Sequence, residues 1–309
     1  MKISLSLIVL LFAAHLNLHA DSNPAPKSIR ESLEVFVNDG SLSGAVTLLY
    51  RDGKVVSEEA IGFQDLESKA PMEKNTLFWI ASMTKPITAT AIMMLQDEGK
   101  LNIDDPVMKY LPEFKGQMLV KEKTAEQTVL VKPTRAITIK DLLTHTSGLV
   151  SNSPLDGEAL DVLNLKEAVI TYALSPLQFE PGSKWSYCNP GINTLGRLIE
   201  VISGLEYATF METRLFEPLG MTETTFWPDE AQLARLATSY QPKADGKGLE
   251  PTTIRYLTAP YSNTKRAPLA AGGLFSTGAD LLKFYTMMLD GGEMNGKRYL
   301  SEAALQSMT

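Results

Sequence analysis

Apolar residues in the first third of the chain change their spacing, and each spacing predicts a different element. Residues 28–37 carry apolar side chains at helical spacing, as on one face of a helix. Two β-rich runs follow at 44–50 and 54–61, separated by Arg-Asp-Gly at 51–53. Because that tripeptide is a tight-turn signal, we expect a helix followed by an antiparallel hairpin.

The run Ile-Thr-Ala-Thr-Ala-Ile-Met-Met-Leu at 87–95 is apolar on nearly every side of a helix. Such a helix is buried, and Gly99 is well suited to end it. The later pattern predicts three more helices, one polar surface excursion and one irregular stretch. The helices are expected at 158–174, 191–204 and 279–289, the excursion at 118–133 and the irregular stretch at 235–264.

The bulk composition is that of an ordinary globular protein. The chain has 309 residues, of which 44% are hydrophobic and 21% charged, and this length suits one large domain or two lobes. Its net charge is −7 and no basic run stands out, so nucleic acid is not an expected partner. Cys188 is the only cysteine, which excludes an internal disulfide.

Residues 1–20 have the pattern of a secretory signal peptide. Lys2 supplies a positive start, residues 3–14 are almost wholly apolar, and Ala20 is a small residue before Asp21. An uncleaved anchor is the alternative, but the apolar run is short for a span of roughly 20 residues. We therefore expect an exported protein, periplasmic or extracellular, with one domain over 21–309 and no stable membrane span after removal of the leader.

A serine and a lysine stand three positions apart at the start of the buried helix. Ser82 and Lys85 would share one helical face, with Cβ atoms roughly 5–6 Å apart. A serine there can act as a nucleophile, and a neighbouring lysine can help to remove its proton. Chance supplies about one such pair in a chain of this composition. A second pair, Ser262 and Lys265, lies in the irregular stretch between prolines and is interpreted as chance.

The pattern Tyr-x-Asn also occurs twice. Tyr187 and Asn189 lie in a loop rich in Pro, Gly and Trp, between two expected helices. A tyrosine beside a cation can act as a general base, and an asparagine can hold a substrate amide or carbonyl. A structural aromatic cluster that closes the loop is the alternative. For Tyr261 and Asn263 the structural interpretation is favoured.

Other templates for serine and metal enzymes fit poorly. The chain has no Gly-x-Ser-x-Gly elbow. His145 is the only histidine outside the leader; it could serve a Ser-His-acid triad, but its flanks indicate a loop that closes a helix. Cys188 is interpreted as a small buried filler, and Gly272-Gly273 as a tight turn before a helix. One histidine and one cysteine do not make a metal site, so no metal or other cofactor is expected.

Five short motifs follow one another along the chain. They are Phe-Trp-Ile-Ala-Ser-Met-Thr-Lys at 78–85, Leu-Leu-Thr-His-Thr-Ser-Gly-Leu at 142–149, Pro-Gly-Ser-Lys-Trp-Ser-Tyr-Cys-Asn at 181–189, Pro-Leu-Gly-Met at 218–221 and Gly-Gly-Leu-Phe-Ser-Thr at 272–277. In this combination the chain resembles the serine β-lactamase-related hydrolase family. That family includes class C β-lactamases, D-alanyl-D-alanine carboxypeptidases of that type and family VIII-type carboxylesterases.

The resemblance implies both a fold and a set of roles. The fold would be α/β (α+β), β-lactamase/transpeptidase-like: an antiparallel sheet flanked by helices plus a mostly helical lobe at about 100–260, with the site between them. Ser82 would be the acyl-forming nucleophile, and its backbone N–H one oxyanion donor. Lys85 would share its proton and keep Tyr187 easy to ionise. Tyr187 would be the general base, and Asn189 would orient the substrate.

The implied reaction is acyl transfer to water through an acyl-enzyme. The substrate would be a carboxylic ester or an amide, such as a β-lactam or a D-Ala-D-Ala peptide, and the partner a small molecule or a peptidoglycan peptide. Two alternatives stay open: a penicillin- or peptidoglycan-binding protein without turnover, and an acyltransferase to an alcohol. The oligomeric state is left open.

The chain departs from the family pattern at one place. The family carries a third motif, Lys-Thr-Gly or His-x-Gly, on a strand beyond Gly272-Gly273, and a second oxyanion donor beside it. Neither tripeptide occurs in this sequence. Residues 301–309 begin like a helix and stop without a cap. We therefore expect the sequence to end inside its domain, with C-terminal sheet strands missing.

Overall fold

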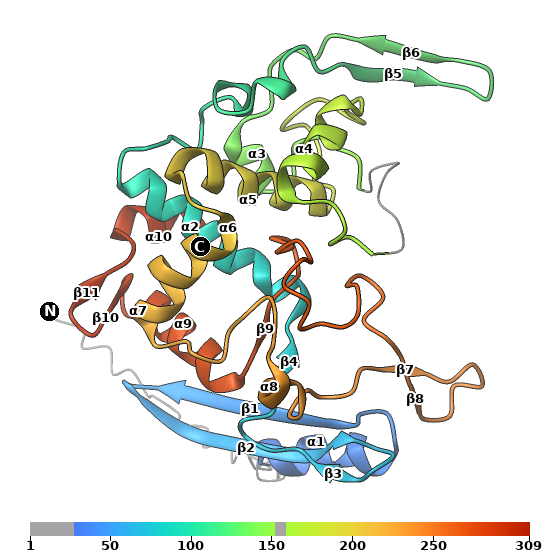
Figure 1. Ribbon diagram of the computed structural model, residues 1–309, viewed down its shortest axis with the longest axis vertical. Helices are drawn as coiled ribbons and strands as arrows, with labels where there is room; N and C mark the ends of the chain where they lie inside the picture. The colour runs from blue at the N-terminus through green and yellow to red at the C-terminus, as the bar shows by residue number, and fades with distance from the viewer. Residues whose placement is uncertain (1–27, 152–158) are drawn as a thin grey trace, which may run out of the picture.

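The computed structural model describes residues 28–151 and 159–309, so the predicted leader lies outside the described residues. An antiparallel three-stranded sheet occupies one side of the molecule, at the bottom of Figure 1. Its strands are β1 (Gly44–Arg51), β2 (Lys54–Asp65) and β3 (Ala70–Pro71), in that order.

The N-terminal helix and hairpin form as predicted. In the β1–β2 register Arg51 is opposite Lys54, so Asp52 and Gly53 make a two-residue turn. Both have left-handed φ angles, +52° and +77°, as a type I′ turn requires. Helix α1 (Ile29–Asn38) begins after Ser28, whose side chain and backbone exchange hydrogen bonds with Glu31 in a capping box.

Helices flank this sheet. Helix α1 lies against β2, and α9 (Gly278–Leu289) packs against β1. The first residue of α9, Gly278, faces Val46 and Leu48 of β1 so closely that a Cβ would touch Leu48. Val46 and Leu48 are therefore partly covered by a helix that follows the strand by more than 200 residues.

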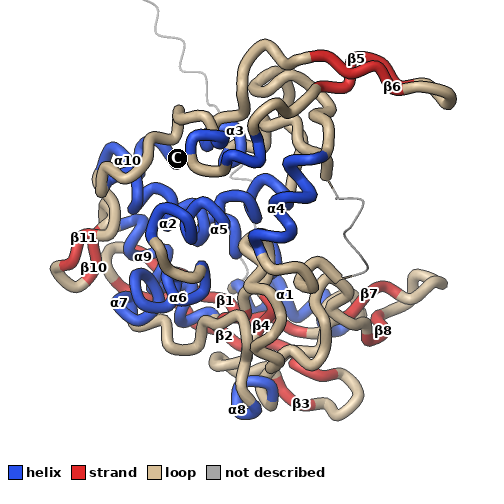
Figure 2. The backbone as a smooth tube through the Cα atoms, turned by 45° about the horizontal axis from the view of Figure 1, so that its top comes forward, coloured by secondary structure: helices blue, strands red, loops and turns tan. Residues whose placement is uncertain are grey.

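The helical body is built around the predicted buried helix, α2 (Thr84–Asp97). Figure 2 shows α2, α5 (Asn189–Ser203) and α4 (Leu165–Leu174) gathered beside one another, and α2 and α4 both contact α5. Ile87, Ile92 and Leu95 of α2 are fully buried. Gly99, with a φ of +70°, follows the end of the helix as expected.

Shorter elements complete the described chain. They are turns of 3-10 helix at Ala81–Met83, Val107–Lys109 and Pro112–Phe114, helices α3 (Ile139–Leu143), α6 (Tyr207–Met211), α7 (Glu217–Leu219), α8 (Glu230–Leu233) and α10 (Glu302–Met308), a π-helical turn at Glu212–Phe216, and the strand pair β10 (Glu293–Met294) and β11 (Lys297–Arg298). Among the described residues, no helix has the length and apolar character that a membrane span requires.

Three predicted segments need correction. The stretches at 118–133 and 235–264 contain hairpins, β5 (Leu119–Lys123) with β6 (Thr128–Val131) and β7 (Tyr240–Pro242) with β8 (Leu249–Pro251). Both are two-stranded ribbons that project from the body in Figure 1. Apart from Leu119 and Val131 at the base of the first ribbon, few of their residues face the core, so the sequence lacks the one-sided apolar alternation that predicts a strand.

The third correction concerns the helix predicted at 158–174. It begins only at Leu165, after Asn164 caps its first turn. The residues before Asn164 make long-range contacts instead: the Leu160 N–H donates to the Tyr256 carbonyl, and Asp161 pairs with buried Arg266. Glu158 lies outside the described residues.

A short strand pair joins the two parts of the fold. Strand β4 (Phe78–Trp79) runs antiparallel to β9 (Phe275–Ser276), and the Ile80 N–H donates to the Leu274 carbonyl at 3.0 Å. Gly272-Gly273 therefore leads into a strand before the next helix, not directly into the helix. The architecture is the predicted one, an antiparallel sheet flanked by helices plus a mostly helical lobe, while the missing C-terminal strands stay a prediction.

Gly148 offers a test of how tightly the loop after α3 is packed. Its φ is +80°, and a Cβ would clash with the carbonyl oxygen of Phe179. We expect Gly148→Ala to lower the free energy of unfolding by about 3 kcal/mol or more, since backbone strain and overpacking each cost about 1–3 kcal/mol. Denaturant unfolding measures the change.

Gly99→Ala is the matched control for Gly148→Ala. Gly99 also has a positive φ, but no atom lies within 4 Å of its Cβ position. The free energy of unfolding of Gly99→Ala should fall by only about 1 kcal/mol, the cost of the backbone strain. Equal losses in the two variants would contradict the tight packing of Gly148 against Phe179.

Candidate active site

Ser82 lies in the 3-10 turn Ala81–Met83, between strand β4 and helix α2. Its side chain is exposed, and its N–H belongs to the first turn, where backbone donors have no helical acceptor. The preceding residue, Ala81, has a φ of +45°, a left-handed conformation that costs a non-glycine residue about 1–3 kcal/mol. Such strain is concentrated at functional sites.

Three side chains that the sequence singled out meet at the Ser82 hydroxyl. The Tyr187 hydroxyl donates to Ser82 Oγ at 2.6 Å, and Lys85 Nζ donates to the same oxygen at 3.1 Å. Lys85 Nζ also lies 4.7 Å from the centre of the Tyr187 ring. Ser82 and Lys85 share a helical face as predicted, and the fold brings Tyr187 to them from 105 positions away.

Lys85 is enclosed by the protein, with 8% of its surface exposed. Its Nζ makes a second hydrogen bond, to the Ala271 carbonyl at 2.5 Å, and among the described residues no carboxylate forms an ion pair with it. Burial lowers the pKa of Lys85, and the interaction with Tyr187 opposes this in part. The amine is thus prepared to give up its proton more readily than an exposed lysine.

Two helices hold the Ala271 carbonyl in place. The Thr88 hydroxyl of α2 donates to the Ala270 carbonyl at 2.8 Å, and Asn193 Oδ1 of α5 accepts the Ala271 N–H at 3.0 Å. Sequence reasoning missed both residues. The sequence feature that could have marked Thr88 and Asn193 is a polar residue within an otherwise apolar helical run.

His145 supports Tyr187 and does not contact Ser82. Its ring lies against the Tyr187 ring, 4.7 Å between centroids, and its Nδ1 accepts the Cys188 N–H at 3.1 Å. Burial, reinforced by the charge of Lys85, lowers the pKa of His145. The ring therefore stays neutral and positions the tyrosine, which agrees with the structural role predicted for it; the described residues form no Ser-His hydrogen bond of a triad.

Cys188 is a buried structural residue, with 2% of its surface exposed. Its Sγ accepts the Gly191 N–H at 3.4 Å and so caps α5. Burial raises the pKa of the Cys188 thiol to about 11. A thiol so protonated is a poor nucleophile, as the interpretation of Cys188 as a filler implies.

Asn189 lies at the start of α5 and lines a pocket of about 210 Å³ beside Ser82. Among the described residues its side-chain amide has no hydrogen-bond partner, so it is available to a ligand. The pocket walls are mainly apolar and aromatic. They comprise Trp79, Ala81, Ser82, Leu160, Tyr187, Asn189, Tyr256, Leu269, Ala271 and Gly272. Nothing in the sequence pattern had marked Leu160 or Tyr256.

The second copies of the two motifs lie in structural contacts. The Tyr261 hydroxyl accepts the Ile254 N–H at 3.2 Å, and its ring packs on Phe275. Asn263 Oδ1 accepts the Lys265 N–H within a local turn. Neither copy lines the pocket beside Ser82, as the sequence context had indicated.

A family model described as Beta-lactamase matches residues 29–309, nearly all of the described chain. The chain belongs to the Beta-lactamase family. This confirms the resemblance inferred from the five segments and the predicted class of enzyme, a serine hydrolase. The individual roles of Ser82, Lys85, Tyr187 and Asn189 stay predictions.

Relatives and solved structures agree with that assignment. Protein Rv1367c of Mycobacterium tuberculosis is 34% identical over 300 residues, which covers 94% of this chain and 72% of the relative. Esterase EstB of Burkholderia gladioli is 29% identical over 269 residues, covering 78% of this chain and 64% of EstB. The structure of EstCE1, "a hydrolase with promiscuous acyltransferase activity", matches with a TM-score of 0.74 and 26% identity over 88% of this chain and 73% of EstCE1.

The lowered pKa of Lys85 leads to a testable pH dependence. In the predicted roles, Lys85 must lose its proton before the proton of Ser82 can be accepted. Acylation of Ser82 should therefore rise with pH as Lys85 becomes neutral. Because burial lowers the pKa of Lys85, the midpoint of the rise should lie below 10.5, the ordinary value for lysine. Single-turnover acylation by a chromogenic ester measures it.

Lys85→Arg provides the comparison, since a guanidinium keeps its proton at every accessible pH. We expect acylation to fall by about 10²–10⁴-fold and the rise with pH to disappear. A folded Lys85→Arg protein with the wild-type pH profile would show that Lys85 does not control the proton.

Proposed function

We propose that this chain hydrolyses carboxylic esters with uncharged acyl groups through a Ser82 acyl-enzyme. The observation that carries the proposal is the Ser82 hydroxyl, which receives hydrogen bonds from Tyr187 and Lys85 at the mouth of an apolar pocket. A nucleophile in contact with a base, itself beside a second titratable group, is the arrangement that covalent catalysis requires.

In each half of the proposed reaction, Tyr187 first accepts a proton and then returns it. When the Lys85–Tyr187 pair has lost a proton, the Tyr187 oxygen takes the proton of Ser82 as Oγ attacks the ester carbonyl carbon. The Ser82 N–H stabilises the oxyanion of the tetrahedral intermediate. Collapse breaks the ester C–O bond, and Tyr187 returns the proton to the leaving alkoxide. Water then repeats the sequence on the acyl-enzyme, releasing the carboxylic acid and free Ser82.

The pocket lining favours esters over the amides that the family resemblance also allows. A β-lactam or a D-Ala-D-Ala peptide brings a carboxylate, and burying an unpaired charge is costly. None of the described residues that line the pocket beside Ser82 is basic. Trp79, Leu160 and Tyr256 instead offer apolar contact to a neutral acyl group. The names of Esterase EstB and of EstCE1, a hydrolase, support the same choice.

Export is part of the proposal and rests on the pattern of residues 1–20 alone. The enzyme would act in the periplasm or outside the cell. Intact mass spectrometry of protein purified from the native compartment should then give a chain that starts at Asp21.

Covalent labelling tests the nucleophile. A fluorophosphonate probe should add one probe mass to the wild-type protein and none to Ser82→Ala, and ester hydrolysis should fall at least about 10³-fold in that variant. Ser262→Ala is the matched control, because it removes the serine of the second Ser-x-x-Lys pair and should behave as wild type. Labelling of Ser82→Ala, or a folded wild-type protein that stays unlabelled, would overturn the proposal.

Substrate preference tests the ester assignment. We expect kcat/KM for p-nitrophenyl butyrate to exceed that for a chromogenic cephalosporin by about 10–100-fold or more, since an unpaired buried polar group costs about 1–3 kcal/mol. A stable penicillin adduct on Ser82 without ester turnover would instead support the binding-protein alternative. Butyryl transfer to an added alcohol in preference to water would support the acyltransferase.

A further inference from the structure

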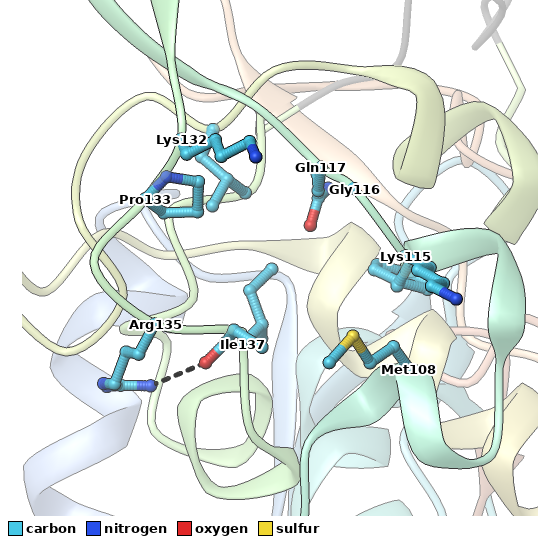
Figure 3. Close-up of a pocket in the computed structure, with 11 residues that line it drawn as sticks. Met108, Lys115, Gly116, Gln117, Lys132, Pro133, Arg135 and Ile137 are labelled. Carbon is cyan, nitrogen blue, oxygen red and sulfur yellow. Dashed lines mark hydrogen bonds between the residues drawn. The ribbon is translucent and has the colours of Figure 1, made fainter.

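A second pocket lies at the base of the β5–β6 hairpin, and we call it the hairpin-base pocket. It holds about 380 Å³, between the segment that leads into β5 and the segment that leaves β6 (Figure 3). It shares no lining residue with the pocket beside Ser82. Its volume is within the range of small-molecule sites, about 300–1,000 Å³.

The floor of the hairpin-base pocket is apolar. Phe114, Ile137 and Leu177 belong to the buried core and line the pocket. Met108 covers one side while 40% of its surface stays exposed. A hydrocarbon or aromatic body would therefore find contact there without displacing polar groups of the protein.

The charges around the hairpin-base pocket are all of one sign. Three lining residues are basic, Lys115, Lys132 and Arg135, and none is acidic. Figure 3 shows Lys115 and Lys132 on opposite sides of the pocket, with Gly116 and Gln117 between them and Met108 and Ile137 below. Among the described residues, neither lysine forms an ion pair.

Two carboxylates on neighbouring segments, Asp141 and Glu180, are already engaged. Both oxygens of Asp141 accept from Arg135, at 2.5 and 2.8 Å, and Asp141 also closes the capping box of α3. The Glu180 carboxylate accepts from the backbone and side chain of Thr134. Asp141 thus neutralises the charge of Arg135. The charges of Lys115 and Lys132 at the rim of the apolar pocket have no such partner among the described residues.

We propose that the hairpin-base pocket binds an organic carboxylate with a hydrocarbon body, independently of the chemistry at Ser82. The carboxylate lies at the rim of the pocket, where Lys132 and Lys115 supply the positive charge, and the body lies on Ile137, Leu177 and Met108. Charge and apolar contact are both required, since an exposed lysine–carboxylate pair is by itself worth little.

Octanoate is the probe, and the Met108 methyl group is the local reporter. In protein labelled with 13C at the methionine methyls, the Met108 signal, assigned with Met108→Leu, should shift saturably on titration with octanoate. Acetate lacks the hydrocarbon body and octanol lacks the charge. Neither should therefore give a saturable shift of the Met108 signal at the same concentrations. Binding should weaken as salt is raised. The readout does not depend on activity, so a failure here is distinct from a failure of the ester proposal.

The variant Lys115→Gln/Lys132→Gln should weaken octanoate binding at least tenfold. Lys121→Gln/Lys123→Gln makes the same change of charge on strand β5, away from the pocket lining, and should bind as wild type. Ala136→Phe fills the pocket without altering charge and should abolish the shift. An unshifted Met108 signal, equal binding of octanol, or undiminished binding by the Lys115/Lys132 variant would each overturn the proposal.

Discussion

The candidate active site depends on the burial of the Lys85 amine, which has no carboxylate partner in the part of the chain that the structure describes. A buried ammonium is costly unless its donors are satisfied, and here the Ala271 carbonyl and the Ser82 hydroxyl accept from it. That requirement joins two parts of the chain 186 positions apart. Thr88 and Asn193 contribute by holding the peptide groups around Ala271, so α2 and α5 serve the site as well as the core.

The same arrangement explains why chemistry is possible at this point of the fold. Burial destabilises the charged form of Lys85, and the amine lies beside the Tyr187 phenol, which also contacts Ser82. His145 keeps that phenol in position with a neutral ring and adds no competing charge. The surroundings of Lys85, Tyr187 and His145 thus favour proton transfer, while Ser82, the predicted nucleophile, stays exposed.

The pocket beside Ser82 and the hairpin-base pocket differ in the charge of their lining residues. The described residues that line the pocket beside Ser82 are mainly apolar and none is basic, which suits the neutral ester that we propose. The hairpin-base pocket combines an apolar floor with two unpaired lysines. The two pockets therefore suit different ligands: a neutral ester in the proposed reaction, and an organic anion in the proposed second site.

Local signals in the sequence determined much of this protein. The capping box at Ser28, the turn at Asp52-Gly53 and the apolar run of α2 depend on neighbours in the chain, and so does the shared face of Ser82 and Lys85. Tertiary structure alone decided that Tyr187 reaches Ser82, that Ala271 receives Lys85, and that Leu160 and Tyr256 wall the pocket. It also decided that residues before Leu165 leave the helix, because Asp161 pairs with Arg266. These contacts join positions about a hundred or more residues apart, and their geometry follows from packing that no local pattern records.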